Sequence, residues 1–483
     1  MKDYSIIASQ IIGCVILLAS AALYAYTTYQ SWDHIAGLND AFRLSLFSFA
    51  LSVLGYSIYS IAMCHWNRPL SMALLASAVV FLPAKLFNEP DQRILVIAVE
   101  GLRADKTSLY GGRLNSTPNL KEWIRSETNI VSFHDAVAHS NDTVSSLHSL
   151  LSGNPIDPDA KTLNVTLAEE GWETRLAYTA SSPRAGMNVE YDEQLALYEA
   201  GAGGTDGMLT AFREWFEDAP SNSMTVLDYS AMQPIGSPEK RFDVFVADGA
   251  DSRQELVQMR PEEAHKVDRT VRAHAPLHYA GSLLEMDSYL GSMLLEMEQA
   301  GELENTMVVF TAPHGWGLFD HGQYAANGQP FDEMCHVPLL VRFPSPVAFP
   351  SVRPRTKDVF APVQLADVVP TLSGYLKQDW SESGRDLTAA VFRGQRPEDT
   401  PIPLRAERHS GTTVGVRFQR WKLFEEHKRN GDVATSVWEI LPPHLDRPVI
   451  GEHAELEAQL QAHLDRFYGD NGEGRVAQSP SDH

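Results

Sequence analysis

Two long uncharged stretches near the N-terminus constrain this chain most, because few environments accept so much apolar surface. Residues 6–29 and 44–66 carry no formal charge, and each stretch is long enough to cross a bilayer as a helix. Residues 70–84 form a shorter third run. The first run is too long for a removable signal peptide. We therefore expect a membrane anchor of two to three transmembrane helices over residues 1–90, with a buried soluble helix as the alternative for each run.

The basic residues of this anchor give a weak orientation signal. Lys2 precedes the first run and Arg68 follows the second, whereas Arg43 is the only basic residue of the loop between them. This excess of basic residues favours a cytoplasmic N-terminus. Three spans would then put the remainder of the chain outside the cytoplasm, whereas two would leave it inside. Lys85 and Arg93, directly after the third run, mildly oppose an outside location.

Charge is distributed as unevenly as hydropathy. Residues 1–92 hold four basic and five acidic residues, so −22 of the net charge of −23 falls on residues 93–483. Such an acidic body is a poor partner for nucleic acid, although a bound cation could still attract a single anionic ester. The three cysteines make a disulfide framework or a cysteine-built zinc site improbable.

The body after residue 90 has the pattern of an α/β fold. Residues 94–99, 308–311 and 338–343 are unbroken β-favouring runs typical of parallel strands buried on both faces, and residues 242–247 form a weaker candidate. A helical pattern over 277–300 ends at a glycine. We expect a catalytic domain over 91–400, a subdomain of antiparallel strands plus a helix over 401–469, and a flexible tail over 470–483.

Three stretches carry groups suited to chemistry at the carboxyl ends of strands. Glu100 directly follows the first strand, where a carboxylate is costly unless it is paired or bound to a cation. Thr143 opens a helical pattern, so it is either a cap or a nucleophile stabilised by the helix N-terminus. His314 and His321 lie in a glycine-rich turn after a strand, which suits metal binding or acid–base work.

These stretches, taken in order, resemble the sulfatase branch of the alkaline phosphatase superfamily. The resemblance covers nearly all of residues 93–470. It rests on an opening strand IAVEGLRAD, a TPNL segment, the spacing of the nucleophile helix over 143–153, an FDE…VPL segment, ADVVPTL and RWKL. It implies an alkaline-phosphatase-like α/β/α sandwich with a small C-terminal antiparallel sheet plus helix, preceded by transmembrane helices.

The resemblance also implies site residues. Thr143 matches the nucleophile, and Glu100, Thr143 and His314 match ligands of a divalent metal such as Zn, Mn, Mg or Ca. His321 and Arg103 match substrate-contacting positions. Pro313 stands where the family has a metal-binding aspartate, so the metal is expected to be held more weakly or lost.

The type of enzyme follows from the residues around the nucleophile. Formylglycine sulfatases need a C/S-x-P-x-R sequence, but Ser145 and Leu147 replace the proline and the arginine. Threonine together with Glu100, after several membrane spans, resembles the phosphoethanolamine and phosphoglycerol transferases and the lipoteichoic acid synthases. The resemblance implies a metal-dependent hydrolase or transferase of phosphate- or sulfate-type esters, anchored in the cytoplasmic membrane with its large domain on the extracytoplasmic side.

Its expected partners are the lipid bilayer and a lipid-linked or glycan substrate, without nucleic acid. The alternative is a pseudoenzyme of the same fold that serves as an envelope sensor or scaffold. The residue that favours this alternative is Pro313, which stands in place of a metal-binding aspartate.

Overall fold

The computed structural model describes most of the chain that follows the expected anchor. The described residues are 92–469 except for gaps at 181–190, 201–203, 231–237, 248–251, 327, 345–352, 381–382, 409, 443 and 450–452. Those from 92–373 and from 379 onward form one compact unit, and residues 374–378 are assigned to another. The apolar runs of residues 1–90 lie outside the described residues. Within the described part, none of the helices combines the length and hydropathy that a bilayer crossing needs.

An eight-stranded mixed sheet forms the centre of the body, in the order β10-β2-β9-β6-β1-β5-β3-β4. Its strands, in chain order, are β1 (Arg93–Val99), β2 (Ile130–Val137), β3 (Glu173–Tyr178), β4 (Glu193–Ala196), β5 (Ser223–Tyr229), β6 (Thr306–Thr311), β9 (His336–Arg342) and β10 (Asp358–Gln364). Residues 94–99 of β1 are at most 1% exposed, because strands lie on both sides of it and helices cover both faces. This agrees with the apolar run that predicted β1.

One strand differs from the expected parallel arrangement. The predicted run at residues 338–343 is β9, which is antiparallel to both of its neighbours, β2 and β6. Burial on both faces makes a strand uniformly apolar whichever way it runs, so composition could not reveal the direction. The weaker candidate at residues 242–247 was wrong, because this segment consists of turns.

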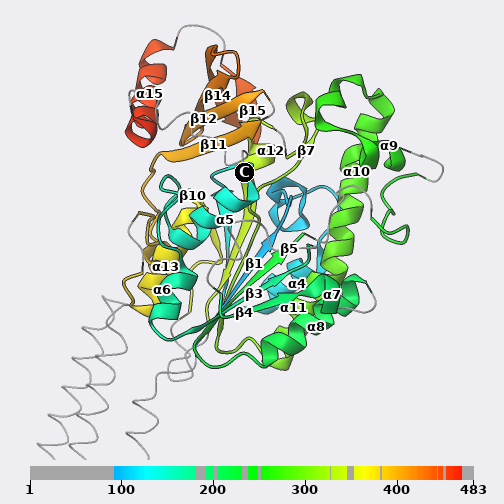
Figure 1. Ribbon diagram of the computed structural model, residues 1–483, viewed down its shortest axis with the longest axis vertical. Coiled ribbons are helices and arrows are strands. Elements are labelled where there is room, and N and C mark those ends of the chain that lie inside the picture. Colours follow the sequence, from blue (N-terminus) through cyan, green and yellow to red (C-terminus); the bar gives the residue numbers. More distant parts are fainter. Residues whose placement is uncertain are drawn as a thin grey trace, which may run out of the picture. The chain divides into compact units, whose positions relative to one another are not determined.

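Helices cover both faces of the sheet, as expected for an α/β/α sandwich (Figure 1). α5, α6 and α13 lie on one face, and α4, α10 and α11 on the other. The helical pattern of residues 277–300 is α10 followed by a π-helical turn, η5, and α11, which ends at Gly301 in the left-handed conformation. The helices are α4 (Pro118–Ser126), α5 (Thr143–Ser152), α6 (Leu163–Glu169), α7 (Leu197–Ala200), α8 (Thr205–Glu217), α9 (Arg253–Gln258), α10 (Arg269–Met286), η5 (Asp287–Gly291), α11 (Ser292–Ala300), α12 (Asp332–Cys335), α13 (Val368–Leu376), α14 (Thr388–Arg393) and α15 (Ala454–Tyr468).

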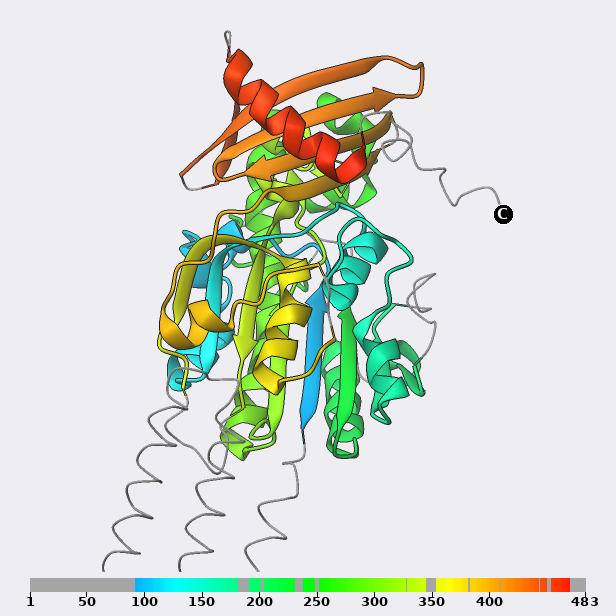
Figure 2. The ribbon, with the colours of Figure 1, turned by 90° about the vertical axis from the view of Figure 1, so that its left-hand side faces the viewer.

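A second, antiparallel sheet lies at the end of the body where the parallel strands finish (Figure 2). It contains β11 (Ile402–Arg408), β12 (Gly411–Phe418), β13 (Trp421–Lys428), β14 (Val433–Leu441) and β15 (Leu445–Pro448), paired in chain order. The amphipathic helix α15 packs on this sheet through Leu460 and Leu464, which are fully buried against Val414, Val416 and Leu423. This confirms the predicted C-terminal sheet and helix. The second sheet therefore lies next to the carboxyl edge of the central sheet, where the candidate site forms.

Candidate active site

Glu100, Thr143 and His314 meet at the carboxyl edge of the central sheet. The hydroxyl Oγ1 of Thr143 lies 3.1 Å from Nε2 of His314 and 3.4 Å from Oε1 of Glu100. The remaining pair, His314 Nε2 and Glu100 Oε1, is 3.7 Å apart. All three side chains are largely buried, with exposed fractions of 12% or less. The structure therefore brings together the nucleophile candidate and both other ligand candidates.

Local structure explains how Glu100 and Thr143 reach this point. Glu100 follows β1, and its backbone NH donates to the carbonyl of Tyr229 at the end of the neighbouring β5. Thr143 is the first residue of α5, whose N-cap Asp142 accepts a hydrogen bond from the NH of Ser145. Thr143 thus lies where the unpaired amides and the dipole of a helix favour negative charge. The cap predicted as the alternative is provided by Asp142, which leaves Thr143 available for the site.

His314 is held by the turn after β6. Its Nδ1 lies 2.7 Å from the carbonyl oxygen of Gly315, which directs Nε2 toward Thr143. Gly315 itself packs against the backbone of Glu333, since a Cβ at this position would lie 2.1 Å from that carbonyl oxygen. Only glycine permits so close an approach. The glycine-rich sequence around His314 is therefore a requirement of the packing that orients the imidazole.

The three groups fit a divalent cation by chemistry and by spacing. Ligand atoms on one ion bound at about 2.0–2.2 Å are roughly 3.0–3.5 Å apart, close to the separations found here. A carboxylate, a hydroxyl and an imidazole are suitable ligands for zinc or manganese. Pro313 is buried beside His314 and offers no side-chain ligand. Among the described residues, this site thus offers three donor side chains.

Asp320 is the first acidic residue after His314 in the chain, but it pairs with Arg103. Its Oδ2 lies 2.5 Å from Nη1 of Arg103. Arg103 is itself 3% exposed, and its Nε and Nη2 donate to Asp105. Burial alone would raise the pKa of the Asp105 carboxyl, but the charge of Arg103 overcomes this and holds the pKa well below its usual range.

Arg103 accordingly directs its charge to these two carboxylates and to the carbonyl of Trp316. The structure therefore assigns Arg103 a positioning contact beneath the turn that carries His314, and its expected role toward substrate stays a prediction.

His321 is also tied to other groups. Its Nδ1 lies 2.8 Å from Oε1 of Glu333, its Nε2 lies 2.7 Å from the carbonyl oxygen of Asp446, and its ring stacks on Phe331. Burial by itself lowers the pKa of this imidazole, but the hydrogen bond and charge of Glu333 raise it to about 9. His321 is thus a protonated group at neutral pH. Its predicted contact with substrate stays a prediction.

A buried ion network behind this site was not predicted from the sequence. Lys422 on β13 is fully buried, and its Nζ lies 2.6 Å from Oδ1 of Asp332 and 3.1 Å from Asp446. In the sequence, Asp332 and Lys422 stand out only as parts of the FDE and RWKL segments. A lysine between apolar residues of a strand could have drawn attention to it, because an unpaired cation cannot be buried there.

Comparison with known proteins agrees with this architecture. The sulfatase family model matches residues 177–377, a range that contains His314 and His321 and begins after Glu100 and Thr143. Arylsulfatase K of Danio rerio is 29% identical over 167 residues, covering 33% of this chain and 30% of that protein. An endo-4-O-sulfatase of Bacteroides thetaiotaomicron is 28% identical over 103 residues, covering 21% of this chain and 19% of that protein. The chain thus aligns with less than a third of the length of these relatives.

Solved structures resemble a much larger part of the chain. A phosphonate monoester hydrolase of Agrobacterium radiobacter has a TM-score of 0.60 at 15% identity, over 78% of this chain and 94% of its own. The C-terminal periplasmic domain of EcEptC from Escherichia coli, in complex with Zn, has a TM-score of 0.52 at 17% identity, over 66% of this chain and 90% of its own. These likenesses establish the alkaline-phosphatase-like fold. The fold agrees with the sulfatase family match, which covers residues 177–377 and thus less than half of the chain.

Proposed function

We propose that this protein is a metal-dependent hydrolase or transferase of phosphate- or sulfate-type esters, with Thr143 as its nucleophile. The observation that carries the proposal is the convergence of Glu100, Thr143 and His314 within 3.7 Å of one another. Fold relatives that include a phosphonate monoester hydrolase and a zinc complex agree with ester chemistry at a metal site. Phosphoryl transfer in envelope lipid or glycan modification is the form that we favour, with the chain anchored in the cytoplasmic membrane and its body outside.

Glu100, Thr143 and His314 would hold the metal, which would lower the pKa of the threonine hydroxyl and polarise the bound ester. The other contributions come from the chain itself. The N-terminus of α5 stabilises negative charge on the threonine oxygen during attack. Attack at phosphorus or sulfur forms a bond to that oxygen and releases the alcohol of the ester. Water or an acceptor hydroxyl then takes the group from Thr143 and restores the free side chain.

Substitution of Thr143 tests this proposal directly. The full-length protein in detergent should cleave an activated aryl phosphodiester, phosphonate monoester or sulfate ester, and Thr143→Val should lower turnover by ~10³-fold or more while keeping the size of the side chain. Thr143→Ser keeps a hydroxyl and should retain partial activity. Thr166→Val is the matched control, because Thr166 lies on α6 and is more exposed than Thr143. Equal turnover by wild type and Thr143→Val would refute the role of Thr143.

A second candidate, the non-catalytic scaffold, is favoured by Pro313. It requires that purified protein binds no stoichiometric metal at the Glu100 site and turns over none of these esters. Pro313→Asp then discriminates between the two. If the site is otherwise formed, the added carboxylate should strengthen zinc binding by at least ~10-fold, by analogy with the 10–100-fold effects of supporting groups around metal sites.

A further inference from the structure

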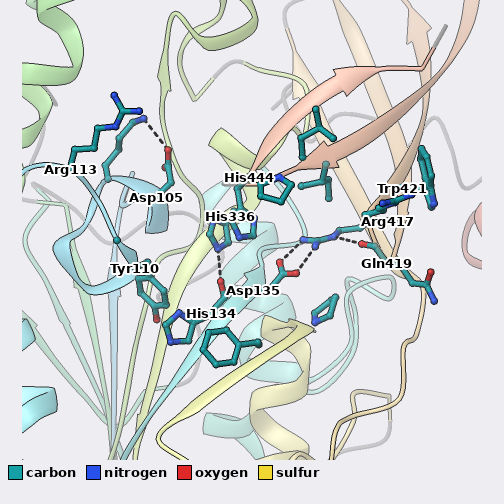
Figure 3. A pocket seen from close by; sticks show the side chains of 18 of the residues that line it. Asp105, Tyr110, Arg113, His134, Asp135, His336, Arg417, Gln419, Trp421 and His444 are labelled. Carbon is teal, nitrogen blue, oxygen red and sulfur yellow. Dashed lines mark hydrogen bonds and ion pairs between the residues drawn. The ribbon is translucent and has the colours of Figure 1, made fainter.

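A cavity of about 1240 Å³ lies between the central sheet, α10 and the second sheet, and it holds a histidine–aspartate cluster apart from Glu100, Thr143 and His314. Asp135 comes from β2, His336 begins β9, and His444 directly precedes β15 (Figure 3). In Figure 3 the two imidazoles lie side by side, with the Asp135 carboxylate below them. One possible ligand atom from each residue lies within 4.8 Å of the other two.

His336 has a buried ring nitrogen that can serve as a ligand atom. It is 3% exposed, and its Nε2 lies 2.9 Å from the carbonyl oxygen of His134, so Nε2 carries the proton. Nδ1 is then the nitrogen with the lone pair. This buried atom has no hydrogen-bond partner among the described residues. A buried, unpaired nitrogen lone pair is costly unless some group completes it.

The second imidazole has a carboxylate on its distal nitrogen, as metal-binding histidines commonly do. Nδ1 of His444 lies 2.9 Å from Oδ2 of Asp332, which leaves Nε2 for a ligand. A carboxylate behind the distal nitrogen fixes the tautomer and raises the basicity of the coordinating nitrogen. His444 retains 27% of its side-chain exposure, so an ion and its solvent can reach it from the cavity.

Asp135 can still bind a cation although it forms an ion pair with Arg417. Arg417 donates one hydrogen bond to each carboxylate oxygen, at 2.7 and 2.6 Å. A carboxylate has about four lone-pair sites, so roughly two remain for a cation. Arg417 fixes the orientation of the carboxylate, while its positive charge is opposed by Asp135 and Asp332. This is the arrangement of an oriented ligand with a supporting hydrogen-bond donor.

We propose that Asp135, His336 and His444 bind a divalent transition-metal ion such as Zn²⁺, with open coordination positions toward the cavity. Two imidazoles and one carboxylate are a common ligand set for such ions when a water or a substrate completes the coordination. The Asp135 site shares none of its ligands with the Glu100, Thr143 and His314 site. The inference is therefore independent of the proposed function.

Binding requires a defined rearrangement. The rings of His336 and His444 are stacked, with centroids 3.6 Å apart and planes inclined by 12°. One ion cannot lie in the planes of both rings while these planes are nearly parallel. The more exposed His444 must therefore turn, and the ligand atoms, which lie within 4.8 Å of one another, must approach to about 3.3–3.5 Å.

Zinc stoichiometry of the full-length protein tests the proposal. His314→Gln removes a ligand candidate of the catalytic site, so this variant isolates the Asp135 site. It should bind one Zn²⁺ in titration calorimetry, and zinc X-ray absorption should detect two imidazole ligands. His314→Gln/His336→Gln should bind zinc at least ~10-fold more weakly or not at all. His134→Gln in the same background is the matched control, because His134 lines the cavity through its side chain but supports His336 only through its backbone.

His314→Gln/His444→Gln guards against a folding defect, because a glutamine amide can still donate to Asp332. The proposal is overturned if the His314→Gln variant binds no zinc, or if its zinc affinity is unchanged by both added substitutions. Failure of the proposed catalytic site would be seen differently, as wild type and His314→Gln binding the same number of ions.

Discussion

Lys422 offers the sharpest test of how the second sheet is joined to the body. Its Nζ is fully buried and contacts Asp332, Asp446 and the carbonyl of Pro330. Lys422→Met keeps the length and most of the volume of the side chain but removes the charge. Two buried carboxylates would then face each other without their cation. Removing one partner of a buried ion pair costs about 3–5 kcal/mol, so we expect the free energy of unfolding to fall by ~4 kcal/mol at pH 8.

The loss should depend on pH with a defined sign. Burial already raises the pKa of Asp446 to about 6, and without Lys422 this pKa rises further. Protonation of one carboxyl then relieves the repulsion, so the loss caused by Lys422→Met should shrink as the pH falls from 8 toward 5. Adding Asp446→Asn to the variant removes one of the two charges and should recover about half of the loss at pH 8.

Urea unfolding of the full-length protein, followed by tryptophan fluorescence, measures this free energy. Trp421 and Trp438 lie on the second sheet and report on its release. Lys428→Met, at the exposed end of the same strand, is the matched control and should change stability by less than about 0.5 kcal/mol. A loss below 1 kcal/mol for Lys422→Met, or a loss independent of pH, would refute the reasoning.

Three further predictions concern the site. His321 has a pKa of about 9 in the folded state, against 6.5 ordinarily. Its contribution to the free energy of unfolding is therefore complete below pH 6.5 and is lost as the pH rises through 9. His321→Gln should lower the free energy of unfolding by about 2 kcal/mol more below pH 6.5 than above pH 9, a figure reduced for the partial exposure of the ring. Gly315→Ala should displace His314, because the new Cβ meets the Glu333 carbonyl, and zinc calorimetry should detect weaker binding. Asp142→Ala removes the N-cap of α5 and should lower stability by about 1 kcal/mol in urea unfolding. A flat difference profile for His321, unaltered zinc affinity or unaltered stability would contradict these expectations in turn.

The sequence predicted the parts of the site that depend on local signals. Glu100 ends a strand, Thr143 begins a helix, and His314 follows a strand within a glycine-rich turn. Carboxyl ends of parallel strands meet at one edge of a sheet, so these residues could be expected together without any knowledge of their distances. The ion pair of Arg103 with Asp320 could not be expected, because it depends on a turn 217 residues away in the chain.

The sequence by itself determined the α/β class, the uncharged N-terminal runs and the order of the motifs that hold the candidate site residues, since each is written in short patterns of hydropathy and residue type. The tertiary structure alone decided that β9 runs antiparallel, that Lys422 is buried in an ion network, and that Asp135, His336 and His444 share a cavity. These features join residues from β2, β9 and the second sheet. They depend on long-range packing, whose free energy is set by three-dimensional neighbours that local sequence patterns do not specify.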